Sequence, residues 1–470
     1  MRVISENETD NVIEWLTEKH LQLVIQQKQK PQQHVVELPS NKKKVVAICG
    51  IETINEVLVE QADSLKRPKF KAFNHQNKII QHIIETQNNE KFKLHRSGME
   101  KVLREQVTSR AAFVESWLQE EIHKQVNVFS NIQKPFDPGP DIALTNLKFL
   151  YRLAFGRNLS PEEIAFFNPK AVDVLPLGVF DMVKLDDIID DELRSVFLSS
   201  KKDLLNIFGE AVDGLEGFVA HNVAEQKKSF DAQHSRGVFD ALLHTHKQLK
   251  NTAEQAVELS EYEILNGSLF QFIGAGVGLT TFFMRFALHY MIIHENIQNK
   301  IQQELDQAIN HGAKTVFSDR KNFPFTEATI WEILRHTSMT NFAPLHYEAT
   351  TDVRAGDVII EKGTLIIANY YSLTRDKRYW HNPETFDPER FLNDEHQIRR
   401  DLVNKFYPFG IGPRRCVGEH LGRTQIFTFF ATLMSQCQFR KSSSTPEVLD
   451  KNSGVFLIPH DYELVVNYRK

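Results

Sequence analysis

The stretch from Phe406 to Arg423, FYPFGIGPRRCVGEHLGR, constrains the fold of this chain more than any other. It places one cysteine, Cys416, between a turn rich in glycine and the start of a helix with an apolar stripe. Gly410 and Gly412 permit backbone angles and a close approach that a Cβ atom would prevent. The stretch therefore predicts a tight loop that presents a single sulfur beside a helix N-terminus.

Cys416 is predicted to be a thiolate, because the positive end of the following helix, together with Arg414 and Arg415, would lower the pKa of its thiol. Gly418 keeps the first turn of that helix free of bulk, and Arg414 is suited to binding a carboxylate. The pattern fits a flat metal cofactor that lies over the loop. The alternative for an isolated cysteine is a small apolar residue of the core.

Composition narrows the class of protein. The chain has 470 residues, of which 41% are hydrophobic, and this is enough for a large core. A net charge of −5 argues against nucleic acid as a partner. Three scattered cysteines argue against a disulfide framework and fit a reducing compartment. No apolar run of the ~20 residues that a spanning helix requires is visible near the amino terminus.

The loop around Cys416 resembles the haem-binding loop of the cytochromes P450, Phe-x-x-Gly-x-Arg-x-Cys-x-Gly. The residues that match this pattern are Phe409, Gly412, Arg414, Cys416 and Gly418. The resemblance implies a mainly α fold with small β sheets, the P450 fold. It also implies that haem b is the cofactor, that Cys416 is the proximal iron ligand, and that Phe409, Gly410, Arg414 and Gly418 contact the haem.

A second motif lies in a predicted helix from Asn89 to Gln106. Phe92 and Arg96 resemble the family's Trp-x-x-x-Arg, whose arginine pairs with a haem propionate. Phenylalanine lacks the indole N–H of tryptophan, so one hydrogen bond worth about 1 kcal/mol is lost or is made by His95 or water. The alternative is a solvated basic helix.

A third motif lies in a long apolar helix predicted from Glu261 to His289. Glycine inside a helix costs about 1 kcal/mol relative to alanine, so another group should approach its backbone. Ala275 and Gly276 resemble the start of the P450 oxygen-groove motif, Ala-Gly-x-acid-Thr. The alternative is close helix packing.

The rest of that motif departs from the family. In this register the acid falls on Gly278 and the alcohol on Leu279. Thr280 and Thr281 follow, and we expect them, with Gly276, to serve the oxygen site unless a local bulge, ordered water or a substrate hydroxyl delivers the protons. The departure leaves open a P450-type hydroperoxide isomerase or dehydratase, or a haem binder without catalysis.

Glu332 and Arg335 form a Glu-x-x-Arg pair that alone is typical of a helix surface. It precedes a Pro-Glu-Arg-Phe segment that contains Arg390, as in the family. The resemblance implies a buried network of Glu332, Arg335 and Arg390 behind the haem loop.

The predicted organisation is an N-terminal segment, residues 1–33, with an amphipathic helix and no visible anchor, followed by a haem domain at residues 34–470. Further expected elements are a hairpin at residues 34–38 and 44–49, helices at 51–61, 292–309 and 323–337, and strands at 456–468.

The resemblance is nearest to the animal microsomal group that includes steroid 17-hydroxylases and xenobiotic-oxidising enzymes. It implies a haem-thiolate monooxygenase that inserts one atom of O₂ into an apolar organic substrate, such as a steroid, lipid or xenobiotic. The implied electron donor is NADPH, through NADPH-cytochrome P450 reductase. The implied location is the endoplasmic reticulum membrane, with peripheral attachment; the alternative is the cytoplasm.

Overall fold

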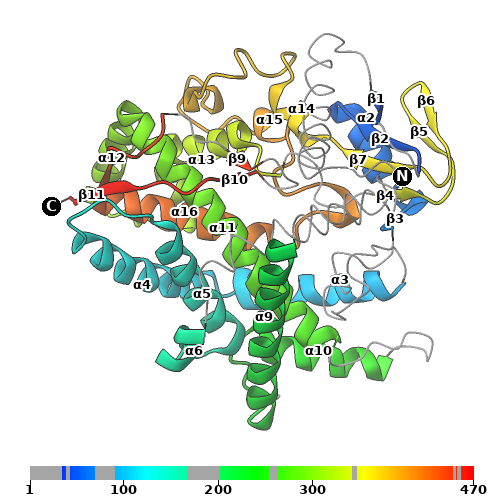
Figure 1. Cartoon of the computed structure of the whole chain (residues 1–470), viewed down its shortest axis with the longest axis horizontal. Helices are drawn as coiled ribbons and strands as arrows, with labels where there is room; N and C mark the ends of the chain where they lie inside the picture. Colours follow the sequence, from blue (N-terminus) through cyan, green and yellow to red (C-terminus); the bar gives the residue numbers. More distant parts are fainter. Residues whose placement is uncertain are drawn as a thin grey trace.

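The structure is a computed structural model that describes residues 34–38, 43–68, 90–166, 202–231, 233–252, 263–340, 347–447, 451–452 and 457–469. Helices form most of these residues, and a small β sheet lies at one edge (Figure 1). The N-terminal segment of residues 1–33 and its expected helix lie outside the described residues. The described part has the mainly α architecture with small sheets that the sequence predicts.

The main sheet has five strands in the order β1-β2-β7-β4-β3. These strands are β1 (Val35–Leu38), β2 (Val45–Ile48), β7 (Leu365–Ala368), β4 (Tyr347–Ala349) and β3 (Leu65–Lys66). β1 and β2 pair antiparallel, which confirms the predicted hairpin, and β2 pairs parallel with β7 from the other end of the chain. The short helix α2 (Ile51–Asn55) and the turn η1 (Glu56–Glu60) follow at the predicted position.

Three two-stranded sheets complete the β structure of the described residues. They are β5 (Val353–Ala355) with β6 (Val358–Ile360), β9 (Lys451–Asn452) with β10 (Ile458–Pro459), and β8 (Cys437–Lys441) with β11 (Leu464–Tyr468). The expected terminal strands are confirmed. They pair with β8 and β9, and not with the main sheet.

The remaining helices surround one core. They are α3 (Glu90–Leu103), α4 (Ala111–Ser130), α5 (Gly139–Phe155), α6 (Pro161–Phe166), α9 (Lys202–Lys228), α10 (Val238–Thr252), α11 (Ser268–Ile293), α12 (Glu295–Asn310), α13 (Pro324–Thr337), α14 (Tyr370–Arg375), α15 (Arg400–Val403) and α16 (Glu419–Gln436). Short 3₁₀ helices are η2 (Ala62–Ser64), η6 (Phe317–Asn322), η7 (Pro388–Phe391) and η8 (Gly412–Arg414), and short π-helices are η4 (Arg104–Thr108) and η5 (Glu263–Gly267). The helices predicted at 292–309 and 323–337 are confirmed as α12 and α13.

The central helix is α11, which packs against α5 and α16, while α4 packs against the same two helices (Figure 1). In the described part of the chain, one helical stretch, Leu265–Ile293, is long and apolar enough to cross a membrane, and 72% of its most apolar window is buried inside the protein. Its apolar character therefore matches its place in the core.

Candidate active site

The loop before α16 folds back on itself to hold Cys416. The backbone N–H of Cys416 donates to the carbonyl oxygen of Phe409 at 2.7 Å. Gly410 and Gly412 have φ angles of 74° and 71°, in the left-handed region that favours glycine. A Cβ on Gly412 would lie 2.2 Å from the carbonyl oxygen of Leu58, so the loop packs tightly against η1. The predicted tight loop is confirmed.

The side chain of Cys416 is exposed at the inner end of this loop. A Cβ on Gly418 would lie 3.9 Å from the Cys416 Sγ, so glycine here leaves the sulfur unobstructed. Within the described residues no group of three His, Cys, Asp or Glu side chains could hold a metal ion. A metal bound to this sulfur must therefore bring most of its own donor atoms, as a porphyrin does.

The prediction that Arg414 and Arg415 lower the pKa of Cys416 is wrong for the protein alone. Although part of the Cys416 side chain is exposed, the surrounding protein keeps water from the thiol, and this desolvation is the largest effect and raises its pKa. A hydrogen bond from the Gly418 backbone N–H and the positive charge of Arg96 oppose this rise only in part. The thiolate therefore depends on the charge of a bound metal, which deprotonates a coordinating thiol.

Three guanidinium groups gather beside the loop. Arg96 of α3 donates to the carbonyl oxygen of Arg415 at 2.7 Å, and Arg414 lies 3.5 Å from the centre of the Phe92 ring. Arg67, just after β3, is buried and lies over the Tyr347 ring. Burial, with repulsion from Arg67 and Arg96, lowers the pKa of Arg414 to about 9. A cofactor that carries carboxylates, such as haem b, fits this cluster of cations.

Sequence reasoning found Arg96 and Arg414 and missed Arg67. Arg67 belongs to a charged Lys-Arg-Pro segment, and nothing in that pattern separates it from a surface arginine. The Nε2 of His95 forms a 2.7 Å hydrogen bond with Ser268 Oγ and so joins α3 to α11. The suggestion that His95 replaces the missing indole N–H stays a prediction.

The open face of α11 is centred on Ala275. Between Ser268 and His289, the residues that are not fully buried are Gln271, Gly274, Ala275, Gly276 and Leu279, and Ala275 is exposed. Residues four apart share a helix face, so Ala275 and Leu279 lie together. The structure therefore places Leu279, where the family has its alcohol, on the same face as Ala275.

The other predicted catalytic residues of α11 lie toward α5. A Cβ on Gly276 would lie 2.7 Å from Leu150 Cδ1, and Asn146 Nδ2 donates to Thr281 Oγ1 at 3.2 Å. Thr280 and Thr281 are both buried, and on an ideal helix Thr280 points about 140° away from Ala275. The catalytic role of Gly276, Thr280 and Thr281 stays a prediction, and their placement favours helix packing.

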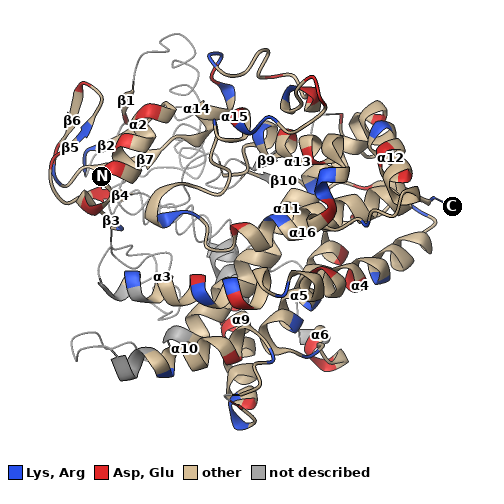
Figure 2. Ribbon diagram, turned by 180° about the vertical axis from the view of Figure 1, so that it is seen from behind, with Lys and Arg blue, Asp and Glu red and all other residues tan. Residues whose placement is uncertain are grey.

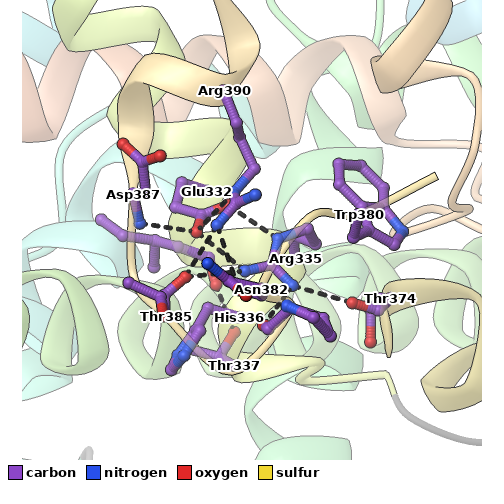
Figure 3. A network of polar contacts seen from close by, with 12 residues as sticks. Glu332, Arg335, His336, Thr337, Thr374, Trp380, Asn382, Thr385, Asp387 and Arg390 are labelled. Atoms are coloured by element: carbon purple, nitrogen blue, oxygen red, sulfur yellow. Dashed lines mark hydrogen bonds and ion pairs between the residues drawn. The ribbon is translucent and has the colours of Figure 1, made fainter. Parts of the chain in front are cut away.

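The predicted buried network is confirmed in its contacts (Figure 3). Arg335 binds Glu332 through two hydrogen bonds of 2.7 and 2.8 Å, and both side chains are fully buried. Arg390 donates to the same carboxylate at 3.2 Å. Arg335 also donates to the carbonyl oxygens of Thr374 and Pro383, each at 2.8 Å. These bonds tie α13 to the segment that leads into the loop of Cys416.

Aromatic rings connect this network with the loop. Phe406, at the start of the loop, lies among Trp331, Trp380 and Phe391, with ring centres 6.2, 5.8 and 6.1 Å away. Trp331 and Phe391 adjoin members of the network in sequence. The charged network therefore fixes the aromatic cluster on which the loop rests.

The fold and the site together define a haem-thiolate protein: one exposed thiol, a cluster of arginines beside it, and a helix with an open face. A family model of cytochrome P450 matches residues 11–466. The chain therefore belongs to the cytochrome P450 family and is a monooxygenase with haem b as its cofactor, which uses O₂ and an apolar substrate.

Curated relatives support this conclusion. The chain is 29% identical to the polybrominated aromatic compounds synthase of Pseudoalteromonas luteoviolacea, over 95% of this chain and 91% of that protein. It is 28% identical to cytochrome P450 1A1 of Oryctolagus cuniculus, over 85% and 78% of the two chains. It is 30% identical to the steroid 17-alpha-hydroxylase/17,20 lyase of Ictalurus punctatus, over 76% and 69%.

Proposed function

We propose that this P450 inserts one oxygen atom into a C–H bond of a steroid, lipid or xenobiotic, with electrons from NADPH through NADPH-cytochrome P450 reductase. The observation that carries the proposal is the exposed Cys416 thiol at the centre of a loop lined by arginines. The names of two relatives, a steroid hydroxylase and a synthase of aromatic compounds, support an apolar substrate. The finer substrate class is our inference.

In this proposal haem b supplies the oxygen chemistry, and each residue has a defined task. Cys416 would hold the iron through its thiolate, a type of ligand that favours O–O cleavage. Arg67 and Arg414 would bind the propionates, together with Arg96, which already pairs with Glu100 at 2.8 Å. Phe92 lies against Arg414, and Ala275 would give the cofactor a helix face without bulk.

Proton delivery in this proposal departs from the family pattern. Leu279 brings no hydroxyl to the face of Ala275, and Thr281 already accepts a hydrogen bond from Asn146. We therefore assign proton delivery to ordered water or to a hydroxyl of the substrate. A threonine relay through Thr280 or Thr281 would require these buried side chains to turn away from α5.

The proposed reductase contacts the side of the protein where α3 meets the loop of Cys416. Lys101, Arg104 and Arg415 are exposed there, and Figure 2 shows Lys and Arg residues on both segments. Arg423, at the start of α16, lies largely buried, 4.9 Å from the centre of the Trp331 ring, with Glu327 and Glu419 nearby. Arg423 therefore packs the start of α16 and does not belong to the docking surface.

We place the protein peripherally at the endoplasmic reticulum membrane, on the basis of its resemblance to microsomal P450s. Cell fractionation tests this location: we expect the protein in the microsomal pellet and its release by carbonate. Recovery in the soluble fraction would contradict the location and leave the chemistry untouched.

The first prediction tests the proposed function directly. The reduced protein with carbon monoxide should show the red-shifted Soret band that thiolate ligation produces, and Cys416→Ala should abolish it. Cys437→Ala, which changes a buried cysteine away from this loop, is the control and should retain the band. The purified protein should then consume NADPH and oxygenate a steroid or an aromatic hydrocarbon when reductase is present.

Two results would redirect the proposal. Conversion of a fatty acid hydroperoxide without NADPH, with no oxygenation when reductase is supplied, would indicate a hydroperoxide isomerase. Haem bound without either reaction would indicate a binder. A protein that takes up no haem would contradict the assignment of Cys416 as the ligand.

A further inference from the structure

The guanidinium of Arg96 is held in one orientation from two sides. Its Nε donates to Glu100 Oε1 at 2.8 Å, and its Nη1 donates to the carbonyl oxygen of Arg415 at 2.7 Å. The Arg96 side chain is 12% exposed, and that of Glu100 is 39% exposed. An arginine side chain has many rotamers in solution, so these two bonds select one of them.

Helix stability does not account for the pair of Arg96 and Glu100. The two residues are four apart on α3. On a helix, an acid four residues before a base stabilises more than the reverse order, and the reverse order is the one found here. A partly exposed ion pair also contributes little to the free energy of unfolding. The contact therefore has more weight as a constraint on the Arg96 guanidinium.

The constraint reaches the peptide that joins Arg415 to Cys416. The carbonyl oxygen of this peptide accepts from Arg96, and its N–H, which belongs to Cys416, donates to the carbonyl oxygen of Phe409 at 2.7 Å. One bond ties the peptide to α3, and the other ties it to the start of its own loop. Turning the peptide would break both bonds, so together they fix the backbone that carries the sulfur.

We propose that Glu100 is a positioning residue for the haem thiolate, which acts through Arg96 on the peptide before Cys416. The inference rests on the assignment of Cys416 as the iron ligand in the proposed function. The Nε and Nη1 groups of Arg96 are committed to Glu100 and to the loop. Among the described residues its Nη2 makes no hydrogen bond, so Nη2 is the group that Glu100 leaves oriented for a propionate.

The Glu100 carboxylate also changes the charge beside the sulfur. Arg414 is repelled by both Arg67 and Arg96, so this side of the loop carries an excess of positive charge. Glu100 offsets part of that excess through its contact with Arg96. Reduction of the haem iron adds one negative charge, which a nearby carboxylate disfavours. Glu100 is therefore expected to lower the reduction potential of the haem.

The first test measures this potential on haem-loaded protein with a chemical reductant, so that docking of a reductase plays no part. Glu100→Gln keeps an oxygen acceptor for Arg96 and removes the charge. We expect it to shift the reduction equilibrium about threefold toward the ferrous form, which is about 28 mV for one electron. Glu105→Gln removes the same charge from an exposed residue of η4 and is the matched control, which should keep the wild-type potential.

The second test separates position from charge. In mild urea, we follow how fast the carbon monoxide complex loses the red-shifted band of thiolate ligation. Glu100→Ala removes both the acceptor and the charge, so it should lose this band about threefold faster than the wild type, or more. Glu100→Gln should lose it at close to the wild-type rate, because its Oε1 can still accept from Arg96 Nε.

A double-mutant cycle tests whether Glu100 acts through Arg96. Lysine lacks the planar group that contacts Glu100 and the Arg415 carbonyl at once, so in an Arg96→Lys background Glu100→Ala should change the rate of band loss little. The same acceleration in both backgrounds would overturn the inference. So would equal potentials in Glu100→Gln and Glu105→Gln. If either occurs while the wild type shows a normal band, the proposed function stands; absence of that band would contradict the proposed function itself.

Discussion

At the scale of single residues, the Glu332–Arg335 pair gives a sharp prediction. Glu332→Ala would leave the Arg335 guanidinium fully buried with only carbonyl acceptors, and Arg335→Ala would leave a buried carboxylate that keeps only Arg390 and the backbone N–H of Asp387. Removing one partner of a buried pair costs about 3–5 kcal/mol. We expect either variant to lose most of its bound haem and to unfold at a markedly lower temperature, as followed by Soret absorbance and calorimetry.

Two further variants separate geometry from charge. Arg335→Lys keeps the charge but lacks the planar group that reaches Glu332 and two carbonyl oxygens at once, so it should rescue little of the lost haem. Glu225→Ala removes an exposed pair with Lys228 and should leave the free energy of unfolding essentially unchanged. Full haem content in Glu332→Ala would show that the network does not support the loop.

The sequence predicts the roles of some site residues and not of others. Cys416, Glu332 and Arg335 were predictable, because each belongs to a fixed spacing of uncommon residue types. Arg67 was not, because its significance lies in where the end of strand β3 brings it. The pKa of Cys416 was predicted in the wrong direction, since local charges are visible in a sequence and burial is not.

At the scale of elements, the contact of α11 with α5 decides the meaning of Gly276. A Cβ there would lie 2.7 Å from Leu150, which is itself fully buried, so larger side chains force the two helices apart. We expect Gly276→Val to cost about 1–3 kcal/mol of stability through overpacking. Combining it with Leu150→Ala should cost at least about 1 kcal/mol less than the sum of the two single changes.

The measurement is a double-mutant cycle by denaturant unfolding, with haem content recorded for each variant. Additive costs would contradict the packing role and restore the oxygen-groove role of Gly276. Sequence periodicity predicted that this helix exists and that another group approaches its glycines. The sequence pattern did not predict which group approaches these glycines. That group is set by how α5 and α11 cross, and the crossing depends on the packing of the folded helices.

At the scale of the whole molecule, segments distant in the sequence meet at one site. Strand β2 near the amino terminus pairs with β7, α3 contacts the loop of Cys416, and α13 holds the segment before that loop. Order of motifs along the chain predicts such a fold only through resemblance to a family. The fold is stable because each of these contacts between distant segments buries paired charges or apolar surface.

The surface where α3 meets the loop of Cys416 gives the last prediction. If an acidic reductase surface docks there, the double variant Lys101→Glu with Arg104→Glu should slow electron transfer from reductase about three- to tenfold at low salt, and the difference should shrink as ionic strength rises. Stopped-flow reduction under carbon monoxide measures this rate. The equilibrium Soret band should be unchanged, because both residues are exposed and lie outside the haem contacts.

Lys362→Glu, which makes half the charge change of the double variant, provides a control for net charge, since Lys362 is exposed in the turn between β6 and β7. It changes the charge of the molecule without altering the proposed docking surface, so reduction should keep its wild-type rate. Equal slowing by Lys362→Glu would mean that overall charge, and not this surface, governs the encounter. Arg423→Gln offers a further contrast: because Arg423 packs beside Trp331, its loss should lower stability and haem retention more than the salt dependence of reduction.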